Sequence, residues 1–504
     1  MNELSRMPLV ESLFAAAEGR FSFHMPANRQ GKSFPPWLRD KLWTLDNTEI
    51  ELTGDINHPE GAVLAAMDLA AKTFGAGHTR FVTTGTTTSL LTALATACPR
   101  GSKLILPRRV HQTIMHGAAL LELEPVWEEP DTGERIEQAL VREITQHPEA
   151  EAVFITTPVY DGTTIPLDKI IQCARDQGTL VIVDEAHGSH FAVAPDLLPP
   201  TALSQGADLV AMSAHKTLPA LTPGSYLHIG NDAITSGRVS AERLGQMLKV
   251  FQTTSPSFVI AASLDYARSW LEIEGRRAVE SLLGLISELN KDLPLTLKRL
   301  HQPSSDPLRL TYDYSGTGRT RAEVRQIFAE GKVDPEVIDL SQIILIPALD
   351  TTGEEMKALA EVLHALDTRG RSFVTDAAGK ANVGGLYSDA EIKSGKNITT
   401  DGRGSSNNQD IGWVHSLLDR SAPAAVPVGE ALFGDICKRE VPLREAVGRA
   451  AAEAIVPYPP GVALVWPGET ITLERIEAIE QLLAADITVY GVHKPDMPSV
   501  NVIE

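Results

Sequence analysis

The sequence predicts an α/β protein built on a large, mostly parallel sheet flanked by helices. The main observation is that short β-branched runs alternate with longer segments of helical period from about residue 60 to residue 260. The chain of 504 residues is also long enough for about three domains of ~150 residues each. Its composition, 43% hydrophobic and 22% charged, is typical of a soluble globular protein and excludes a disordered or fibrous one.

The large domain is expected to consist of strands that each lead into a helix. Apolar runs rich in β-branched residues predict strands at 80–84, 103–107, 124–127, 152–158, 180–187 and 207–212. Helical period follows the first four of these runs, at 90–98, 111–121, 135–147 and 166–178. Because a helix between two strands returns the chain to the start of the sheet, these strands are expected to be parallel.

A smaller α/β lobe is expected after the large domain. Helical segments at 240–252 and 263–290 lead into it. Strand-like runs at 307–314 and 342–349 then alternate with helical ones. This alternation predicts a second layer of sheet and helix that is smaller than the first.

The end of the chain is expected to form a small C-terminal domain. Helical period returns at 444–455 and 474–485. Before it, a stretch rich in Gly, Ser, Asn, Asp and Lys indicates a linker or long surface loop. The predicted boundaries are 1–285 for the large domain, 286–370 for the small lobe, 371–425 for the linker and 426–504 for the C-terminal domain.

The charge and the cysteines restrict the partners and the compartment. Forty-five basic and 65 acidic residues give a net charge of −20, which repels nucleic acids and anionic membrane surfaces. Cys98, Cys173 and Cys437 are far apart and lack the spacing of metal ligands, so free thiols in a reducing compartment are expected. The first twenty residues have neither the basic start nor the continuous apolar run of a signal peptide. We therefore expect a cytoplasmic protein without a nucleic-acid or membrane partner.

The motif Gly-Thr-Thr-Thr-Ser at 85–89 follows a predicted strand and opens a predicted helix. Backbone N–H groups at a helix start, together with threonine hydroxyls, form a site suited to a phosphate group. The alternative is a helix whose threonines only fill its first turn. The motif alone does not decide between these interpretations.

The motif Val-Asp-Glu-Ala-His-Gly-Ser-His at 183–190 lies at the end of an apolar strand, where parallel sheets place ligand-binding residues. Its Asp-Glu-Ala-His also occurs in helicases, but the G-x-x-x-x-G-K-[ST] loop that their ATP hydrolysis needs is absent. Glu185, His187 and His190 could be metal ligands, but no second ligand cluster accompanies them. No metal is therefore expected.

The motif Ser-Ala-His-Lys-Thr at 213–217 also follows an apolar strand. A lysine among small and hydroxyl side chains at a strand end could form an imine if its amine is desolvated, whereas most single lysines are solvated surface residues. The order of the motifs favours the chemical interpretation: a phosphate-type turn comes first, then Asp184, then Lys216 thirty-two residues later.

Together with other segments, these motifs resemble the Orn/Lys/Arg decarboxylases, pyridoxal-phosphate enzymes with the aspartate aminotransferase type of fold (fold type I). The other segments are His-Met-Pro at 24–26, 48–61, Thr-Ser-Pro-Ser at 254–257 with Ser-Leu-Asp-Tyr-Ala-Arg after it, and 458–469. The resemblance covers nearly the whole chain except 370–425. It is to the shorter form of the family, which lacks an N-terminal wing domain.

The resemblance implies a role for each residue in these motifs. Lys216 would bind pyridoxal phosphate covalently, and Asp184 would pair with the pyridine nitrogen and keep it protonated. Thr87 and Thr88, with Ser213, would hold the phosphate.

Three histidines complete the implied site. His111 would stack on the cofactor ring, and His187 would lie close to the edge of the ring. His215 would contact the phosphate or the substrate and is a candidate proton donor. Taken without the resemblance, His111 and His187 could equally be capping or core histidines.

The implied activity is decarboxylation of a basic L-amino acid, with arginine favoured and lysine or ornithine possible, in polyamine-type metabolism. Transamination on the same cofactor, or a non-catalytic protein that binds it, are the alternatives. Candidate acidic residues for the substrate side chain are Asp46, Glu49, Glu51, Asp55 and Glu469, although solvated or capping roles are the alternative for each. The family builds its site at a two-fold interface, so a homodimer is expected.

Three departures from the family pattern bear on substrate identity. The chain has Ala27, Asn28 and Arg29 where the family has Gly-His-Lys. Its phosphate turn is all-threonine, and Pro-Gly-Ser-Tyr-Leu-His at 223–228 replaces a common Gln-Gly-Ala-Tyr-Leu-His. Hydroxyl donors for a phosphate remain in spite of these changes.

Overall fold

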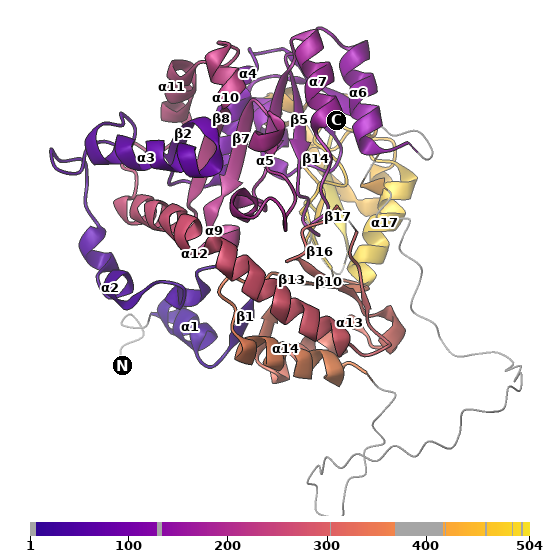
Figure 1. Cartoon of the computed structure of the whole chain (residues 1–504). Coiled ribbons are helices and arrows are strands. Elements are labelled where there is room, and N and C mark those ends of the chain that lie inside the picture. Colours follow the sequence, from indigo (N-terminus) through magenta and orange to yellow (C-terminus); the bar gives the residue numbers. More distant parts are fainter. Residues whose placement is uncertain are drawn as a thin grey trace, which may run out of the picture.

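A seven-stranded sheet forms the centre of the protein (Figure 1). The computed structural model describes residues 7–128, 134–302, 304–367, 417–418, 420–458, 461–485, 487–494 and 497–504. The strands run in the order β2-β8-β7-β6-β5-β3-β4. Their bounds are β2 (Ala76–Val82), β3 (Lys103–Pro107), β4 (Glu124–Glu128), β5 (Ala152–Thr156), β6 (Leu180–Asp184), β7 (Leu209–Ser213) and β8 (Ser225–Gly230).

The predicted fold class is confirmed, because β3 to β7 pair in parallel. The sequence analysis did not predict β8, which pairs antiparallel with both β7 and β2. This strand follows Lys216 after a short loop, so the chain turns back beside β7 without a crossover helix.

Helices cover both faces of the sheet, and the strands bury both sets of side chains. Ile105, Val153 and Val183 pack on the side of α3 (Gly61–Phe74), α6 (Ile136–Gln146) and α7 (Asp168–Gln177). Leu104, Phe154 and Ile182 pack on the side of α4 (Thr86–Ala97), α5 (Gln112–Leu120) and α11 (Ala241–Phe251). Burial on both faces explains the continuous apolar runs in the sequence. Further helices are α1 (Pro8–Ala17), α2 (Pro36–Arg39), α8 (Ala202–Gln205), α9 (Ala214–Thr217) and α10 (Asn231–Thr235).

A small lobe lies beside the large domain and is joined to it by α12 (Phe258–Lys291), a helix of 34 residues (Figure 1). Its antiparallel sheet has the order β12-β13-β10-β9. The strands are β9 (Lys298–Arg299), β10 (Leu310–Asp313), β12 (Val337–Ile338) and β13 (Gln342–Leu345), and the helices are α13 (Arg321–Glu330) and α14 (Gly353–Ala365). Near the chain start, β1 (Phe21–Phe23) pairs with β11 (Val333–Pro335) of this lobe.

The C-terminal part has its own apolar core around Ile476, Ile479 and Val500. This part contains two antiparallel strand pairs. They are β14 (Lys438–Pro442) with β17 (Ser499–Ile503) and β15 (Val456–Tyr458) with β16 (Thr488–Tyr490). Of the two helices here, α16 (Val428–Phe433) packs against α5 of the large domain, and α17 (Leu473–Ala484) packs in the C-terminal core. The second of these confirms the helix predicted at 474–485. The predicted linker lies outside the described residues from 371 to 416.

The helix predicted at 444–455 is wrong. A short 3₁₀ turn covers Leu443–Ala446, after which Gly448 takes a left-handed conformation with φ of 80°. The backbone N–H of Ala451 then donates to Glu469 O, at 2.9 Å. Small alanines gave a helical pattern, but here they let backbone segments approach within a packed core.

A buried ion pair ties the large domain to the C-terminal part. Arg108 donates from Nη1 and Nη2 to the two Glu469 carboxylate oxygens, at 2.8 and 2.7 Å. The side chains are only 1% and 4% exposed. The Arg108 guanidinium also lies over the rings of Trp127 and Trp466. Because both charges are shielded from water, removal of either one would leave the other buried and unpaired.

Glu469→Gln is therefore expected to lower the free energy of unfolding by about 3 kcal/mol, because the Arg108 charge loses its partner. Denaturant unfolding measured by fluorescence checks this. The matched control is Asp196→Asn, which breaks an exposed pair with Arg276 and should cost less than about 1 kcal/mol. Equal losses for the two variants would contradict the assigned importance of the buried pair.

None of the helices in the described part of the chain is long and apolar enough to span a membrane.

Candidate active site

A cavity of about 190 Å³ opens where the strands of the large sheet end. Asp184 is the last residue of β6, and Lys216 lies on α9, which begins directly after β7. Side chains from all parts of the chain meet here: His111, Asp184 and Lys216 from the large domain, Asp339 from the small lobe and Val462 from the C-terminal part. Carboxyl ends of parallel strands are where α/β proteins bind ligands.

Lys216 is held among charged and polar groups inside this cavity. Its Nζ lies 3.1 Å from His187 Nε2. Burial and the nearby Arg309 charge lower the pKa of the Lys216 amine, while the Asp184 charge opposes this change. The alternative of a solvated surface lysine does not describe this environment. A desolvated amine is a better nucleophile at neutral pH than an exposed one.

Asp184 is 5% exposed and accepts a hydrogen bond from the backbone N–H of Ala186, at 3.0 Å. Burial raises the pKa of its carboxyl group, and the positive charges of Lys216 and of His111, when protonated, act against this rise. Its position is fixed by β6, in which Val181, Ile182 and Val183 are fully buried in the sheet. A carboxylate so placed suits a cationic partner within the cavity.

His111 caps the start of α5 and lies on the exposed side of the cavity. Its Nδ1 accepts the backbone N–H of Thr113 at 3.2 Å, which leaves the ring proton on Nε2. The Thr113 hydroxyl lies 3.4 Å from that of Thr87. His111 therefore serves as a helix cap and also lines the cavity, so the two interpretations of this residue are compatible.

His187 is nearly enclosed and has partners on three sides. Lys216 lies at Nε2, and Arg309 donates from Nη2 to Nδ1, at 3.1 Å. The Tyr160 ring meets the His187 ring edge to face, with centroids 5.4 Å apart. Burial lowers the pKa of His187 well below its usual value, and the charges of Lys216 and Arg309 add to this effect. The ring is therefore neutral at physiological pH.

The start of α4 lies next to the end of β7. Gly85 precedes the helix with φ of 92°, a conformation that glycine adopts readily. The Thr86 hydroxyl is hydrogen-bonded to the Ser213 hydroxyl and lies 3.1 Å from that of Ser225. The sequence analysis missed Thr86, although it belongs to the same motif. The Thr87 side chain is exposed, whereas the buried Thr88 hydroxyl donates to Thr84 O at 3.4 Å.

Comparison with known proteins shows the family. The family model described as Orn/Lys/Arg decarboxylase, major domain, matches residues 7–305, and that of the C-terminal domain matches residues 432–488. The chain belongs to the Orn/Lys/Arg decarboxylase family. Members of this family are amino-acid decarboxylases.

Two relatives and one solved structure illustrate the similarity. The Bacillus subtilis protein YaaO, described as uncharacterized, is 30% identical, and the match covers 96% of each chain. An arginine decarboxylase of the same organism is 29% identical over 96% of this chain and 94% of its own. The structure of the Escherichia coli constitutive lysine decarboxylase has a TM-score of 0.71 at 19% identity and covers 99% of this chain and 82% of its own. The fold is therefore fold type I, as predicted.

His215 is turned away from the cavity of this decarboxylase family member. Its Nδ1 donates to Gly224 O at 3.0 Å, and the residue does not line the described cavity. Burial lowers the pKa of its ring. The backbone oxygen of His215 accepts the N–H of Ala27, at 2.9 Å.

Residues 27–29, which depart from the family pattern, include two side chains that hold the N-terminal segment in place. Asn28 donates from Nδ2 to Ala220 O at 3.0 Å. Arg29 is 6% exposed and pairs with Glu355 at 2.6 Å and Asp350 at 2.8 Å. Asn28 thus holds the N-terminal segment to the loop after Lys216, and Arg29 holds it to the small lobe.

The five candidate carboxylates for the substrate side chain do not line the described cavity, which agrees with the alternative of solvated or capping roles. Glu469 pairs with Arg108, and Asp55 lies 2.7 Å from His58 Nδ1. Asp46, Glu49 and Glu51 are exposed on the single chain. Instead, Asp161 and Asp339 line the cavity. Both lie in loops without a sequence motif, so only the tertiary structure reveals them.

The three possible metal ligands of the 183–190 motif point to different partners. Glu185 accepts the backbone N–H of Ala202 at 2.9 Å, and His190 lies 3.2 Å from Asp306. His187 contacts Lys216 and Arg309, as described above. In the described part of the chain, these side chains do not converge on one point.

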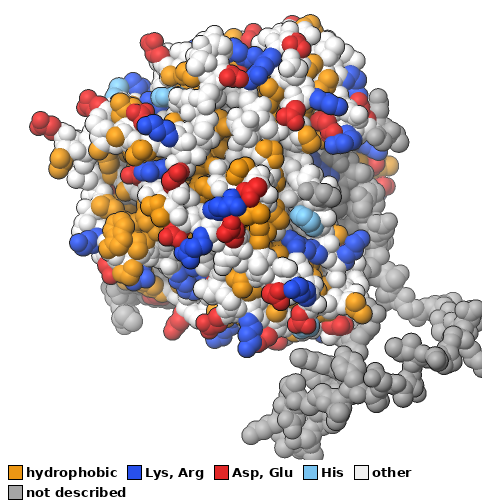
Figure 2. Space-filling view, viewed as in Figure 1, with side chains coloured by type: hydrophobic (Ala, Val, Ile, Leu, Met, Phe, Trp, Pro, Cys, Tyr) orange, Lys and Arg blue, Asp and Glu red, His pale blue; other side chains and the backbone are white. Residues whose placement is uncertain are grey.

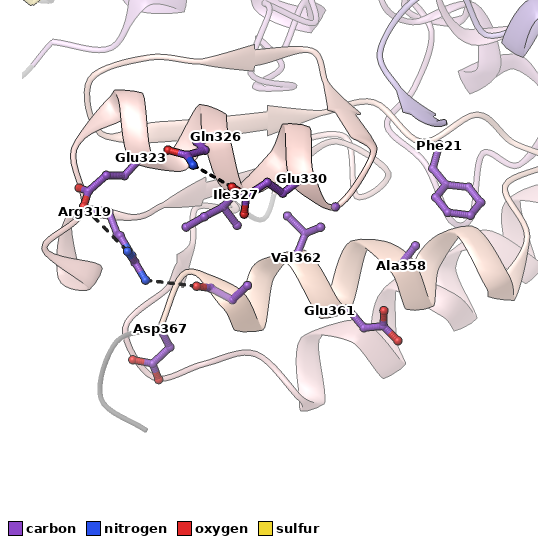
Figure 3. Close-up of a pocket in the computed structure, with 12 residues that line it drawn as sticks. Phe21, Arg319, Glu323, Gln326, Ile327, Glu330, Ala358, Glu361, Val362 and Asp367 are labelled. Carbon is purple, nitrogen blue, oxygen red and sulfur yellow. Dashed lines mark hydrogen bonds and ion pairs between the residues drawn. The ribbon is translucent and has the colours of Figure 1, made fainter. Parts of the chain in front are cut away.

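A larger cavity of about 640 Å³ lies in the small lobe between α13 and α14 (Figure 3). Arg319, Glu323, Glu330 and Glu361 contribute charged groups to its lining. None of the described residues around it belongs to the predicted site. The larger volume of this cavity is therefore no argument that it takes part in the chemistry at Lys216.

Proposed function

We propose that the chain removes the α-carboxyl group of a basic L-amino acid, with pyridoxal phosphate bound covalently at Lys216. The observation that carries this proposal is the position of the Lys216 amine, which lies 3.1 Å from His187 Nε2 in a cavity that also contains Asp184. Membership in a family of amino-acid decarboxylases supports the reaction type.

The residues around the cavity fit this cofactor chemically. Asp184 offers a buried carboxylate for a protonated pyridine nitrogen, and the exposed face of His111 is open to an aromatic ring. Exposed Thr87 and the N–H groups at the start of α4 suit the phosphate. Thr86 and Ser213 lie beside this helix start, and Thr88 adds its backbone N–H rather than its hydroxyl.

When bound, pyridoxal phosphate withdraws electrons from the substrate Cα, so that the α-carboxyl group leaves as CO₂. The chain supplies the conditions for this loss. The negative charge of Asp184 would keep the pyridine nitrogen of the bound cofactor protonated. Apolar side chains limit water around the reacting carbon and strengthen these electrostatic effects; they are Val110, Val159, Val337, Ile344 and Val462. Lys216, which lines the cavity, would return a proton to Cα, whereas the bond from His215 to Gly224 O argues against His215 as the donor.

Asp161 and Asp339 line the cavity, and their negative charges favour a substrate with a basic side chain. One oxygen of each carboxylate accepts a backbone N–H of its own loop, from Thr163 at 2.9 Å and from Gln342 at 2.8 Å. Several relatives are named arginine decarboxylase and others lysine decarboxylase. We place arginine first, followed by lysine and ornithine. The amine product would enter polyamine-type metabolism, and the acidic chain with its free thiols suits the cytoplasm.

The decisive experiment incubates the full-length protein and pyridoxal phosphate with arginine, lysine, ornithine and a neutral amino acid. Release of CO₂ and the mass of the amine are measured together. Equal amounts of CO₂ and amine from a basic amino acid are expected. Keto acid without CO₂ would show transamination instead, and bound cofactor without turnover would show a non-catalytic protein.

We also propose that the protein is a homodimer, as the family resemblance implies. The α1 helix has no buried residue, and Leu9, Leu13 and Phe14 on it are 71%, 62% and 74% exposed. Trp37 of the neighbouring α2 is exposed as well, and Figure 2 shows hydrophobic side chains gathered around α2. A second copy that covers this surface would remove it from water.

Replacing both Leu13 and Phe14 by Asp is expected to weaken the dimer about a hundredfold, because each apolar side chain contributes ~1.5 kcal/mol or more when buried. Sedimentation velocity at several concentrations measures this. The control is Val250→Asp, at an exposed position on α11. A wild-type protein that sediments as a single chain at all concentrations would refute the dimer.

A further inference from the structure

Arg309 contacts the site from the small lobe, although the proposed reaction does not use it. It directly precedes β10, is 3% exposed, and lies with Nη2 at 3.1 Å from His187 Nδ1. A guanidinium remains protonated at all physiological pH values and has only hydrogen-bond donors. Nη2 therefore donates, and His187 Nδ1 accepts.

Packing keeps Arg309 in this position. Gly162 has φ of 93°, and a Cβ atom there would come within 2.8 Å of Arg309 Cβ, so only glycine leaves space for the arginine. The nearby Asp306 carboxylate supplies an opposite charge. The Nε and Nη1 atoms of Arg309 have no hydrogen-bond partner among the described residues. Among the described residues, the bond to His187 is therefore the hydrogen bond that orients this guanidinium.

The acceptor role of Nδ1 decides where the ring proton of His187 lies. The ring is neutral, since burial lowers its pKa well below the usual value, and it carries one proton. With Nδ1 accepting from Arg309, that proton must be on Nε2. Because Nε2 lies 3.1 Å from Lys216 Nζ, the Nε2–H group faces the lysine nitrogen.

A donor that faces Lys216 selects one form of its side chain. An ammonium group has three donors and no lone pair, so it would place donor against donor. A neutral amine has a lone pair that accepts the Nε2–H bond. The hydrogen-bond pattern therefore matches the neutral amine, which is the form that attacks an aldehyde.

We propose that Arg309 is a positioning residue that sets the tautomer of His187, so that Nε2–H donates to the Lys216 amine and keeps it unprotonated. This inference rests on one part of the proposed function, namely that Lys216 is the nucleophile. The proton positions on His187 and Lys216 do not depend on which amino acid is the substrate.

Other groups act on the same lysine, so the test must separate charge from tautomer. The Asp184 and Glu336 carboxylates favour the ammonium form, whereas burial and the Arg309 charge favour the amine. His111 and His215 are also near Lys216, and desolvation lowers the pKa of both rings. Arg309 thus acts through its charge and, in our proposal, through the tautomer of His187.

The first measurement uses the full-length protein before pyridoxal phosphate is added. NMR of histidine labelled with the heavy nitrogen isotope reports which ring nitrogen carries the proton, and His187→Gln assigns the signal. Protonated Nε2 and unprotonated Nδ1 are expected. A wild-type signal with the proton on Nδ1 would overturn the proposal, whatever the variants show.

Three variants then separate the effects. In Arg309→Met, which loses donor and charge, the His187 proton is expected to redistribute toward Nδ1. Labelling of Lys216 by an amine-reactive reagent, followed by mass spectrometry across pH, should become about tenfold slower at neutral pH, equal to one pKa unit. Arg309→Lys keeps a charged donor and Arg309→Gln an uncharged one, so both should retain the Nε2 tautomer.

The control is Arg299→Met, in the same lobe, whose guanidinium donates to Pro307 O at 2.9 Å and not to His187. It should change neither the tautomer nor the labelling. An unchanged tautomer in folded Arg309→Met would overturn the proposal. If that variant does not fold, the wild-type spectrum still decides. Failure to decarboxylate any amino acid would refute the proposed function and leave these proton positions intact.

Discussion

Replacement of Lys216 by alanine is expected to abolish covalent binding of pyridoxal phosphate and to lower kcat by about a thousandfold or more. The variant loses the amine that we propose as the nucleophile and as the group that returns a proton to Cα. Absorbance of the imine between protein and cofactor, together with the rate of CO₂ release, measures the two effects. Retention of the imine band in Lys216→Ala would show that another lysine binds the cofactor.

Two further variants make this test specific. Lys216→Arg keeps a positive charge but has no amine that forms an imine, so it too should lack the band. Lys169→Ala, on the exposed part of α7, should keep both the band and the activity. The fold should survive in Lys216→Ala, since burial disfavours the charged lysine that is removed. Unchanged thermal unfolding checks this last point.

Asp184→Asn is expected to lower kcat by about a hundred- to a thousandfold while covalent binding at Lys216 persists. The amide has nearly the same shape but no charge to hold a proton on the pyridine nitrogen. Asp184 also raises the pKa of Lys216, so its removal should move labelling of the apoprotein amine to lower pH. Steady-state kinetics and the labelling profile measure these effects.

Glu185→Gln is the matched control, one residue along the chain. The Glu185 carboxyl is buried, its pKa is raised well above the usual value, and it accepts a bond from Ala202 rather than lining the cavity. Because burial favours the uncharged form of this carboxyl, the amide replaces it closely and kcat should change little. Equal losses in the two variants would mean that Asp184 acts through local structure and not through its charge.

The sequence predicted the parts of the fold that depend on local pattern. Strands such as Lys103–Pro107 and helices such as Leu473–Ala484 agree with the predicted segments, because apolar periodicity reflects burial directly. The alanine-rich stretch at 444–455 misled this reasoning, since alanine favours a helix and also suits close backbone packing.

The same reasoning extends to the candidate site. Asp184 and Lys216 could be found because each directly follows an apolar strand, and neighbouring parallel strands end at the same edge of the sheet. Asp161, Asp339 and Arg309 could not be found, because they come from loops and from the small lobe. Glu469 was one of five candidates for binding the substrate side chain, but its partner is Arg108.

The sequence by itself therefore determined the alternation of strands and helices in the large domain, the family, and the positions of Asp184 and Lys216 at the ends of two strands. Those features follow from residue type and spacing along one segment. Tertiary structure alone decided that Thr86 meets Ser213 and that Arg309 reaches His187. Such contacts join residues more than a hundred positions apart, and they depend on how packed elements bring their ends together in space.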